Sequence, residues 1–267
     1  FRRQALPERL VATSSLSFKG LRNQYRRDGL GAEMVADTKV GRDWRTEQGF
    51  AELPVPVVTA LLSFGGGTLQ EVLVTKEATL HLLDPLQQKE LYVAGNLVPL
   101  AANFTAGYGL WLARSDFARQ AFWNLMGASD ALAEPQLFLL QPFDPNRKII
   151  LLLHGIASSP EAWVNTANEV LGDEALRERY QLWQLYYPTN LPLLLNVQSL
   201  RARIVSTLQH FDPEGKTAAA SEMVIIGHSM GGVLARLLVS DSGDQILQSI
   251  SQQRHLDSRR QQLFFQR

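Results

Sequence analysis

Residues 225–232 read Ile-Ile-Gly-His-Ser-Met-Gly-Gly and set the architecture expected of the whole chain. The apolar run that leads into them, residues 223–226, predicts a strand, and the apolar run that leaves them, residues 233–239, predicts a helix. A serine on a sharp strand-to-helix turn takes a strained backbone conformation that pushes its hydroxyl into the open. We therefore interpret Ser229 as a candidate nucleophile at the tip of this turn.

The neighbours of Ser229 support this interpretation. Gly227 and Gly231 complete a Gly-x-Ser-x-Gly spacing, and both must be small because strand and helix pass close together at such a turn. Met230 opens the predicted helix, where unpaired N–H groups and the helix dipole favour a developing negative charge. His228 lies within the turn, and we expect its role to be structural. The same spacing also arises by chance in ordinary turns, but the flanking strand and helix favour a nucleophile.

A second motif follows the continuous apolar run at residues 148–153, which predicts a buried strand of a parallel sheet. The run ends in His154-Gly155-Ile156. Residues 157–161 then read Ala-Ser-Ser-Pro-Glu, in which the serine and glutamate at positions 158 and 161 fit a capping box and the proline fits a first helical turn. We therefore expect a second strand–loop–helix unit with His154 and Gly155 in its loop.

The two motifs and their order resemble the α/β-hydrolase superfamily, in particular its lipase and esterase branch, over about residues 136–240. The resemblance implies that the backbone N–H groups of Ile156 and Met230 form an oxyanion hole. Such donors contribute roughly 3–4 kcal/mol each to lowering the barrier. In that family the position of His154 packs and orients the loop, so we expect a structural role there and not that of a general base.

Strands and helices alternate regularly through the second half of the chain. This alternation predicts an α/β fold with a doubly wound parallel sheet of the α/β-hydrolase type. We expect the sheet to be incomplete at its C-terminal end. The predicted strands are 136–141, 148–153, 181–187 and 223–227, and the predicted helices are 160–178, 196–210 and 230–240.

The first half of the chain predicts two further regions. Residues 1–50 are mixed and polar, and we expect an N-terminal arm with modest helical content. Residues 51–115 form a β-rich accessory domain, such as a small antiparallel sandwich, and residues 116–267 form the hydrolase domain, which opens with a helix at 116–126. The expected accessory strands are 55–64, 69–75, 78–83, 89–94 and 110–113, separated by turn signals that include the glycines at 65–67.

A serine hydrolase also needs a carboxylate and a histidine, which follow the serine in this family. Asp241 or Asp244 with His255 has the right order, but the spacing is too short for two further strand–loop units. Three explanations fit: the sequence is a fragment, a separate C-terminal fragment carries the catalytic Asp and His, or the elbow persists without a triad. Because strained turns persist mainly where function uses them, we favour the fragment.

The composition narrows the classes of partner. The 26 basic and 26 acidic residues balance, which argues against a nucleic-acid partner. The chain contains no cysteine, which excludes disulfides and thiolate metal sites, and no cofactor or metal is predicted. The sequence begins at Phe1 without a methionine, so we expect an upstream segment such as a signal or lipoprotein anchor, consistent with a bacterial cell envelope or periplasm.

Two functions of different classes follow from these patterns. The first is a carboxylic-ester hydrolase that acts on small-molecule or lipid esters through an acyl-enzyme on Ser229. The second is a non-catalytic binding protein in which residues 51–115 recognise a partner and the hydrolase fold is a scaffold. A complete triad distinguishes them, because only the enzyme needs an activated serine.

Overall fold

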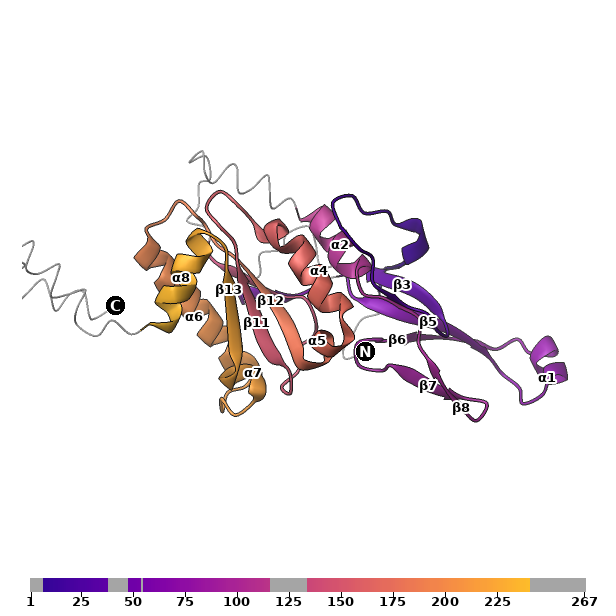
Figure 1. Ribbon diagram of the computed structural model, residues 1–267. Helices are drawn as coiled ribbons and strands as arrows, with labels where there is room; N and C mark the ends of the chain where they lie inside the picture. Colours follow the sequence, from indigo (N-terminus) through magenta and orange to yellow (C-terminus); the bar gives the residue numbers. More distant parts are fainter. Residues whose placement is uncertain (1–6, 38–47, 54, 116–133, 241–267) are drawn as a thin grey trace, which may run out of the picture.

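The computed structural model describes residues 7–37, 48–53, 55–115 and 134–240. They form an elongated molecule with a large sheet and its helices at one end and a smaller β-rich part at the other (Figure 1). The large sheet has the strand order β13-β11-β12-β10-β4. These strands are β13 (Met223–Gly227), β11 (Lys148–Leu153), β12 (Tyr180–Tyr186), β10 (Gln136–Leu139) and β4 (Phe50–Glu52).

The large sheet is mixed, whereas the sequence predicted a parallel one. Strand β11 pairs in parallel with both β12 and β13, so these three strands point the same way. Strand β10 pairs antiparallel with β12 and parallel with β4, so β10 and β4 run in the opposite direction. The reversal of β10 follows from its connection, because only residues 140–147 separate it from β11 and no crossover helix lies between them.

Both faces of the sheet are buried, which explains the unbroken apolar run in β11. Ile149, Leu151 and Leu153 belong to one core cluster, and Ile150 and Leu152 belong to the other. Alternate residues of a strand point to opposite faces, so a strand covered on both sides has to be apolar throughout. On the first face, the cluster includes residues of α6 (Leu193–Phe211), α7 (Ala218–Ser221) and α8 (Met230–Val239); on the second, residues of α2 (Ala106–Arg114) and α4 (Val164–Gly172).

The smaller part is built around a four-stranded antiparallel sheet with the order β1-β3-β5-β6. Two short ribbons accompany it, β2 with β9 and β7 with β8. The bounds are β1 (Arg9–Ala12), β2 (Arg26–Arg27), β3 (Ala32–Asp37), β5 (Val57–Phe64), β6 (Ala78–Leu83), β7 (Glu90–Val93), β8 (Asn96–Pro99) and β9 (Ala102–Asn103), with a 3-10 turn η1 (Thr13–Ser15).

The prediction of a separate N-terminal arm over residues 1–50 was wrong for the described part of that region. Strands β1 and β3 are integral to the four-stranded sheet, because β3 lies between β1 and β5. Val35 of β3 is fully buried in the same cluster as Phe138 of β10. The N-terminal residues therefore share a core with the large sheet.

Two segments predicted as strands are helices. Residues 69–74 form α1 (Leu69–Val74), which begins with a capping box between Thr68 and Glu71. That cap satisfies backbone N–H groups at the helix start and outweighs the β-branched residues in the segment. Residues 110–113 belong to α2, at whose start the Asn103 side chain accepts hydrogen bonds from the backbone N–H groups of residues 105 and 106.

The single helix predicted over residues 160–178 is divided into three pieces. A 3-10 turn, η2 (Pro160–Trp163), precedes α4, and Asp173 then separates α4 from α5 (Glu174–Arg179). Asp173 caps α5 by accepting a hydrogen bond from the Leu176 N–H at 2.8 Å. The predicted capping box is not formed, because Ser159 is the residue before η2 and makes no capping side-chain bond. The predicted helix at 116–126 lies outside the described residues.

Buried polar contacts join the two parts of the molecule. Thr105 donates a hydrogen bond from Oγ1 to Asn168 Oδ1 at 2.7 Å, and Asn168 Nδ2 donates to the Asn23 carbonyl at 2.9 Å. Close by, the Arg177 guanidinium lies 3.6 Å from the centre of the Phe104 ring, which is a cation–π contact. Helices α4 and α5, which pack beside the large sheet, are thus joined to the segments around Asn23 and Thr105 in the smaller part.

We expect Asn168→Ala to lower the free energy of unfolding by about 2 kcal/mol, because it removes the partner of the buried Thr105 hydroxyl and of the partly buried Asn23 carbonyl. Urea unfolding followed by circular dichroism measures the change. Thr166→Ala, at an exposed position of the same helix, is the control and is expected to stay within about 0.5 kcal/mol of the wild type. Equal stability of both variants would contradict the role given to Asn168.

Candidate active site

Ser229 lies in the turn between β13 and α8, at the carboxyl end of the three parallel strands (Figure 1). Its backbone angles are φ 54° and ψ −120°, a region that residues with a side chain rarely occupy. A conformation of this kind costs on the order of 1–3 kcal/mol and persists only where the surrounding structure enforces it. The Ser229 side chain is exposed.

Hydrogen bonds hold the turn on both sides of Ser229. The His228 N–H donates to the carbonyl of Leu153 in the neighbouring strand β11 at 3.0 Å. The N–H groups of Gly231 and Gly232 donate to the carbonyls of His228 and Ser229, each at 2.9 Å. The strained residue is therefore fixed between a strand-to-strand bond and the first turn of α8.

The two glycines of the motif are required by close backbone contacts. A Cβ atom on Gly227 would lie 2.2 Å from the Gly231 carbonyl oxygen, and one on Gly231 would lie 2.3 Å from the Leu153 carbonyl oxygen. Both distances are far below van der Waals contact, and the atoms met belong to the backbone. Gly232, one residue further, is different, because a Cβ there meets nothing nearer than 3.4 Å.

The loop after β11 lies against the serine turn. A Cβ atom on Gly155 would lie 3.0 Å from His228 Nδ1 and 3.2 Å from Ser229 Cβ, so the absence of a side chain lets the two loops meet. Ala157 has a φ of 50°, and its N–H donates to Thr189 Oγ1 at 3.1 Å. Thr189 thereby fixes the loop to the segment after β12. The sequence analysis did not identify this contact, because only the position of Thr189 after a strand marks it.

The two predicted oxyanion donors are free to bind a ligand. Within the described ranges, no group accepts a hydrogen bond from the backbone N–H of Ile156 or Met230, and none bonds to Ser229 Oγ. Met230 is the first residue of α8, so its N–H has no partner inside the helix. The contact of Gly155 with Ser229 brings both donors into the neighbourhood of the serine.

His154 is a buried packing residue. Its ring is fully buried and stacks on Tyr187, with ring centres 4.2 Å apart and planes 12° apart. Nδ1 lies 3.0 Å from the Gly155 carbonyl, to which it donates, and Nε2 accepts from the Tyr187 N–H at 3.4 Å. Both nitrogens are engaged, and burial lowers the pKa of His154 to about 4, so the ring is neutral and unavailable to Ser229.

Two tyrosines at the end of β12 complete this packing. Tyr187 donates its hydroxyl hydrogen bond to the His154 carbonyl, and burial raises the pKa of this phenol. Tyr186 lies next to the same histidine, at a ring distance of 5.8 Å. Both are almost fully buried, so these aromatic rings pack beneath the loop of His154 and are not open to a ligand.

His228 is exposed and points its ring toward the second loop, since Nδ1 is the atom nearest to the Gly155 position. In the part of the chain that the structure describes, no histidine or carboxylate is hydrogen-bonded to Ser229. The candidate triad residues Asp241, Asp244 and His255 lie outside the described residues. The site as described therefore consists of the candidate nucleophile and the two candidate oxyanion donors.

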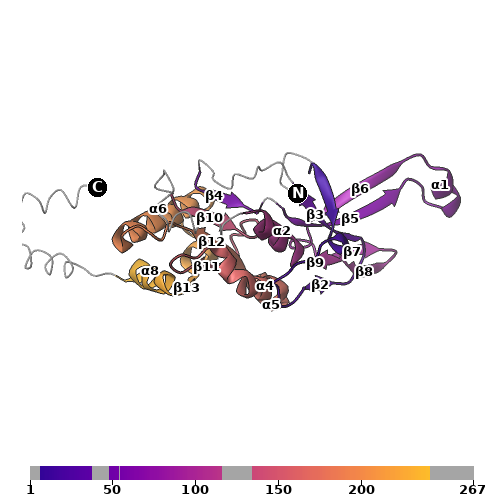
Figure 2. The same cartoon turned by 90° about the horizontal axis from the view of Figure 1, so that it is seen from above.

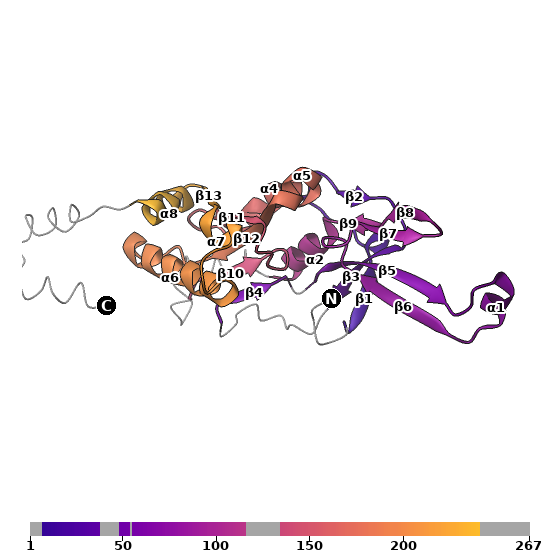
Figure 3. The same ribbon diagram turned by 90° about the horizontal axis from the view of Figure 1, so that it is seen from below.

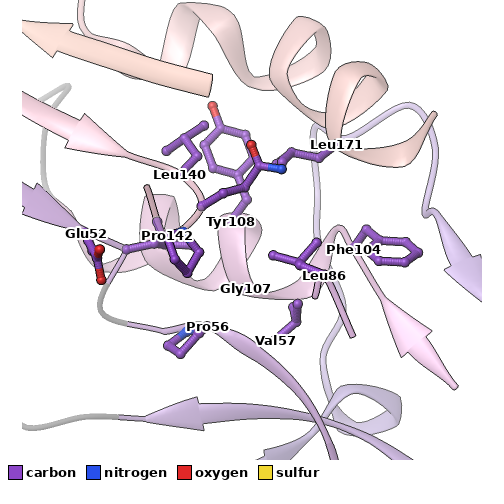
Figure 4. Close-up of a pocket in the computed structure, with 12 residues that line it drawn as sticks. Glu52, Pro56, Val57, Leu86, Phe104, Gly107, Tyr108, Leu140, Pro142 and Leu171 are labelled. Atoms are coloured by element: carbon purple, nitrogen blue, oxygen red, sulfur yellow. The ribbon is translucent and has the colours of Figure 1, made fainter. Parts of the chain in front are cut away.

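A small pocket lies elsewhere in the molecule, between the large sheet and the smaller part (Figure 4). Leu140 forms part of its wall, and the Leu140 N–H donates to the Leu182 carbonyl near the start of β12. The pocket therefore lies at the amino ends of the parallel strands, whereas Ser229 lies at their carboxyl ends. Apolar side chains dominate the lining, and the Tyr108 hydroxyl accepts a bond from Gln184 at 2.8 Å. We assign no chemistry to this pocket.

Comparisons with protein families, curated proteins and solved structures find no match to this chain. Among the described residues, no cluster of three potential metal ligands is found. No helix in those ranges has the length and apolar character needed to cross a bilayer. The case for a function rests on the geometry around Ser229.

Gly231→Ala is expected to lower the free energy of unfolding by more than about 2 kcal/mol, because the new methyl group meets the Leu153 backbone in a tightly packed turn. Gly232→Ala is the matched control. It has room for the methyl group and replaces a glycine inside a helix, so it is expected to stabilise the protein by about 0.5–1 kcal/mol. Chemical denaturation of both variants measures the difference, and equal effects would contradict the close crossing.

The buried neutral His154 predicts a pH dependence of stability. Its folded pKa of about 4 lies below the ordinary value of 6.5, so the unfolded chain binds the extra proton between these values. The folded state therefore loses stability as the pH falls from 6.5 toward 4, by about 3 kcal/mol from this group. Unfolding free energies across this range should fall less steeply in His154→Gln. Identical slopes would contradict the assignment.

Proposed function

We propose that this protein is a serine hydrolase of the α/β-hydrolase type, which cleaves carboxylic esters of lipids or other acyl compounds through an acyl-enzyme on Ser229. The observation that carries the proposal is the strained conformation of Ser229, enforced by glycines that cannot carry a Cβ and placed beside two unpaired N–H groups. Strain of this kind is characteristic of functional sites. The resemblance of the two motifs to the lipase and esterase branch supports the same reaction class.

In the proposed reaction, Ser229 Oγ attacks the ester carbonyl carbon and its proton passes to a general base. The carbonyl oxygen gains negative charge, which the N–H groups of Ile156 and Met230 bind. Collapse of this intermediate releases the alcohol, which takes up the proton, and leaves the acyl group on Ser229. Water then attacks the acyl carbonyl in the same way and releases the carboxylic acid.

The base and its orienting carboxylate come from outside the described residues. His154 does not serve, because it is buried and both of its nitrogens are engaged. The candidates remain His255 with Asp241 or Asp244, or a separate C-terminal fragment that carries the pair. Strand β13 is compatible with either source, because within the described residues it forms an edge of the sheet and a further strand can pair with it.

The surroundings of Ser229 favour an apolar acyl group. Ile156 is 59% exposed in the loop that supplies an oxyanion donor. The first turn of α6, Leu193–Leu195, presents three exposed leucines after the neighbouring strand β12. The bond from Ala157 to Thr189 ties these two loops together, and Asn196 Nδ2 fixes the second by donating to the Pro188 carbonyl at 3.0 Å. No metal or cofactor enters this mechanism.

The alternative is a non-catalytic binding protein built on a hydrolase scaffold. The observation that favours it is that no described histidine or carboxylate bonds to Ser229 Oγ. A scaffold has no need of an activated serine, so reactivity at Ser229 separates the two functions.

A fluorophosphonate probe tests the proposal on the complete gene product, in which the base and acid can come from any part. We expect one adduct in the intact mass spectrum, mapped by peptide sequencing to Ser229 and abolished in Ser229→Ala. Ser206→Ala, at an exposed serine of α6, is the control and should be labelled as the wild type. A full-length protein that forms no adduct would contradict the hydrolase and leave the scaffold.

A further inference from the structure

The longest projection of the molecule is the hairpin of β5 and β6, which carries α1 at its tip. It extends away from the body at the end opposite to α6 and α8 in all three views (Figures 1, 2 and 3). The strands pair from Thr59 with Leu83 at the base to Phe64 with Ala78 near the tip. An isolated two-stranded hairpin is marginally stable in water, so a projection of this length calls for a surface that covers it.

One face of this hairpin is apolar and exposed. The register places Leu62 opposite Leu80, and both side chains are 53% exposed; Phe64, two residues along from Leu62, is 50% exposed on the same face. The other face is more polar toward the tip, where Ser63 pairs with Thr79 and its hydroxyl lies 2.8 Å from His81 Nε2, although Leu61 lies on this face opposite His81. The two faces of the hairpin thus differ in polarity near the tip, which is typical of a strand pair that lies at a boundary between water and an apolar phase.

Helix α1 continues the exposed apolar surface to the tip. Leu69, Leu73 and Val74 are 74–78% exposed, and none of the helix residues is buried. The backbone of the tip is nevertheless hydrogen-bonded internally. The Glu71 carboxylate accepts bonds from the N–H groups of Gly67 and Thr68, and the Thr68 hydroxyl accepts from the Glu71 N–H. These bonds satisfy part of the backbone at the helix start, which lowers the cost of placing the tip at the boundary of a phase that has little water.

The neighbouring β7–β8 hairpin repeats this pattern at the same end of the molecule (Figures 1 and 3). Tyr92 is paired with Leu97, and these side chains are 72% and 65% exposed. Residues 91–99 contain no charged side chain, and in residues 57–75 the only charged side chain is Glu71, which already serves as a helix cap. The β5–β6 hairpin carries a single lysine, Lys76, next to Glu77 and five residues from Glu71, so neither hairpin has the excess of lysines or arginines that attracts anionic lipids.

We infer that these two hairpins dock onto an uncharged lipid surface. The docking surface consists of Leu62, Phe64, Leu80, Leu69, Leu73 and Val74, together with the pair Tyr92 and Leu97. It projects outward, so a rigid partner would need a matching hollow, whereas a lipid layer adapts to the tip. The exposed leucines would enter the boundary between headgroups and acyl chains, as apolar faces of interfacial elements do, with Glu71 at the depth of the headgroups.

The inference rests on the proposed function, because a hydrolase of lipid esters has to reach a surface where its substrate gathers. The hairpins would then hold the enzyme at that surface by contacts separate from the Ser229 site. Binding and hydrolysis are therefore measured independently, with Ser229→Ala protein used to follow binding alone.

The test is co-flotation of the full chain with phosphatidylcholine vesicles, with or without added phosphatidylserine. We expect wild type and Ser229→Ala to float equally, with no gain from anionic lipid and no loss at high salt. Leu69→Ala/Leu73→Ala should lower the partition coefficient at least about tenfold, because apolar side chains are lost while alanine keeps the helix. Val205→Ala, at an exposed apolar position of α6, is the control and should float like the wild type.

Three outcomes would overturn the inference. The first is no flotation with phosphatidylcholine, and the second is unchanged flotation of Leu69→Ala/Leu73→Ala. The third is a lipid-free dimer, seen by light scattering, that this double variant converts to a monomer, since the hairpins would then bind a second copy. Flotation without reactivity at Ser229 would leave the docking in place and contradict the proposed function.

Discussion

The crossing of the β13–α8 turn over the end of β11 is the constraint on which the site depends. The backbone of Gly231 approaches the Leu153 carbonyl so closely that a Cβ atom would lie 2.3 Å from it. Ser229, two residues before Gly231, lies in this turn with a φ of 54°. It also brings the Gly155 loop against the serine, so the loop that carries the Ile156 N–H lies next to the candidate nucleophile.

The large sheet supplies the rigidity that this contact needs. Strand β11 is buried on both faces, and its end is fixed by the stack of His154 on Tyr187 and by the bond from His228 to Leu153. On a mobile support the backbone of Ser229 would relax to an unstrained conformation, whereas here the packed core holds it in the strained one. The buried His154 ring therefore helps to fix the loop that lies against Ser229, although the ring itself does not contact the serine.

Local signals in the sequence were sufficient to predict the strands and the helix start around the candidate site. The strands at 148–153 and 223–227 have the bounds predicted from their apolar runs, and α8 begins at Met230 as predicted. The errors lie where pairing is non-local or a cap decides the outcome. Nothing in residues 9–12 and 32–37 reveals that they pair with each other and that 32–37 also pair with β5. The short connection after β10 reversed that strand. The Thr68–Glu71 cap is visible in the sequence, but the strand prediction for residues 69–75 rested on their β-branched residues and did not take the cap into account.

The most direct test of the central claim is a crystal structure of the complete protein after reaction with a phosphonate ester. We predict a covalent bond from Ser229 Oγ to phosphorus, with the phosphonyl oxygen within hydrogen-bonding distance of the Ile156 and Met230 nitrogens, at about 2.7–3.1 Å. The same map would show which histidine lies next to Ser229. A phosphonyl oxygen turned away from both nitrogens, or an unmodified Ser229 with an ordinary negative φ, would contradict the account.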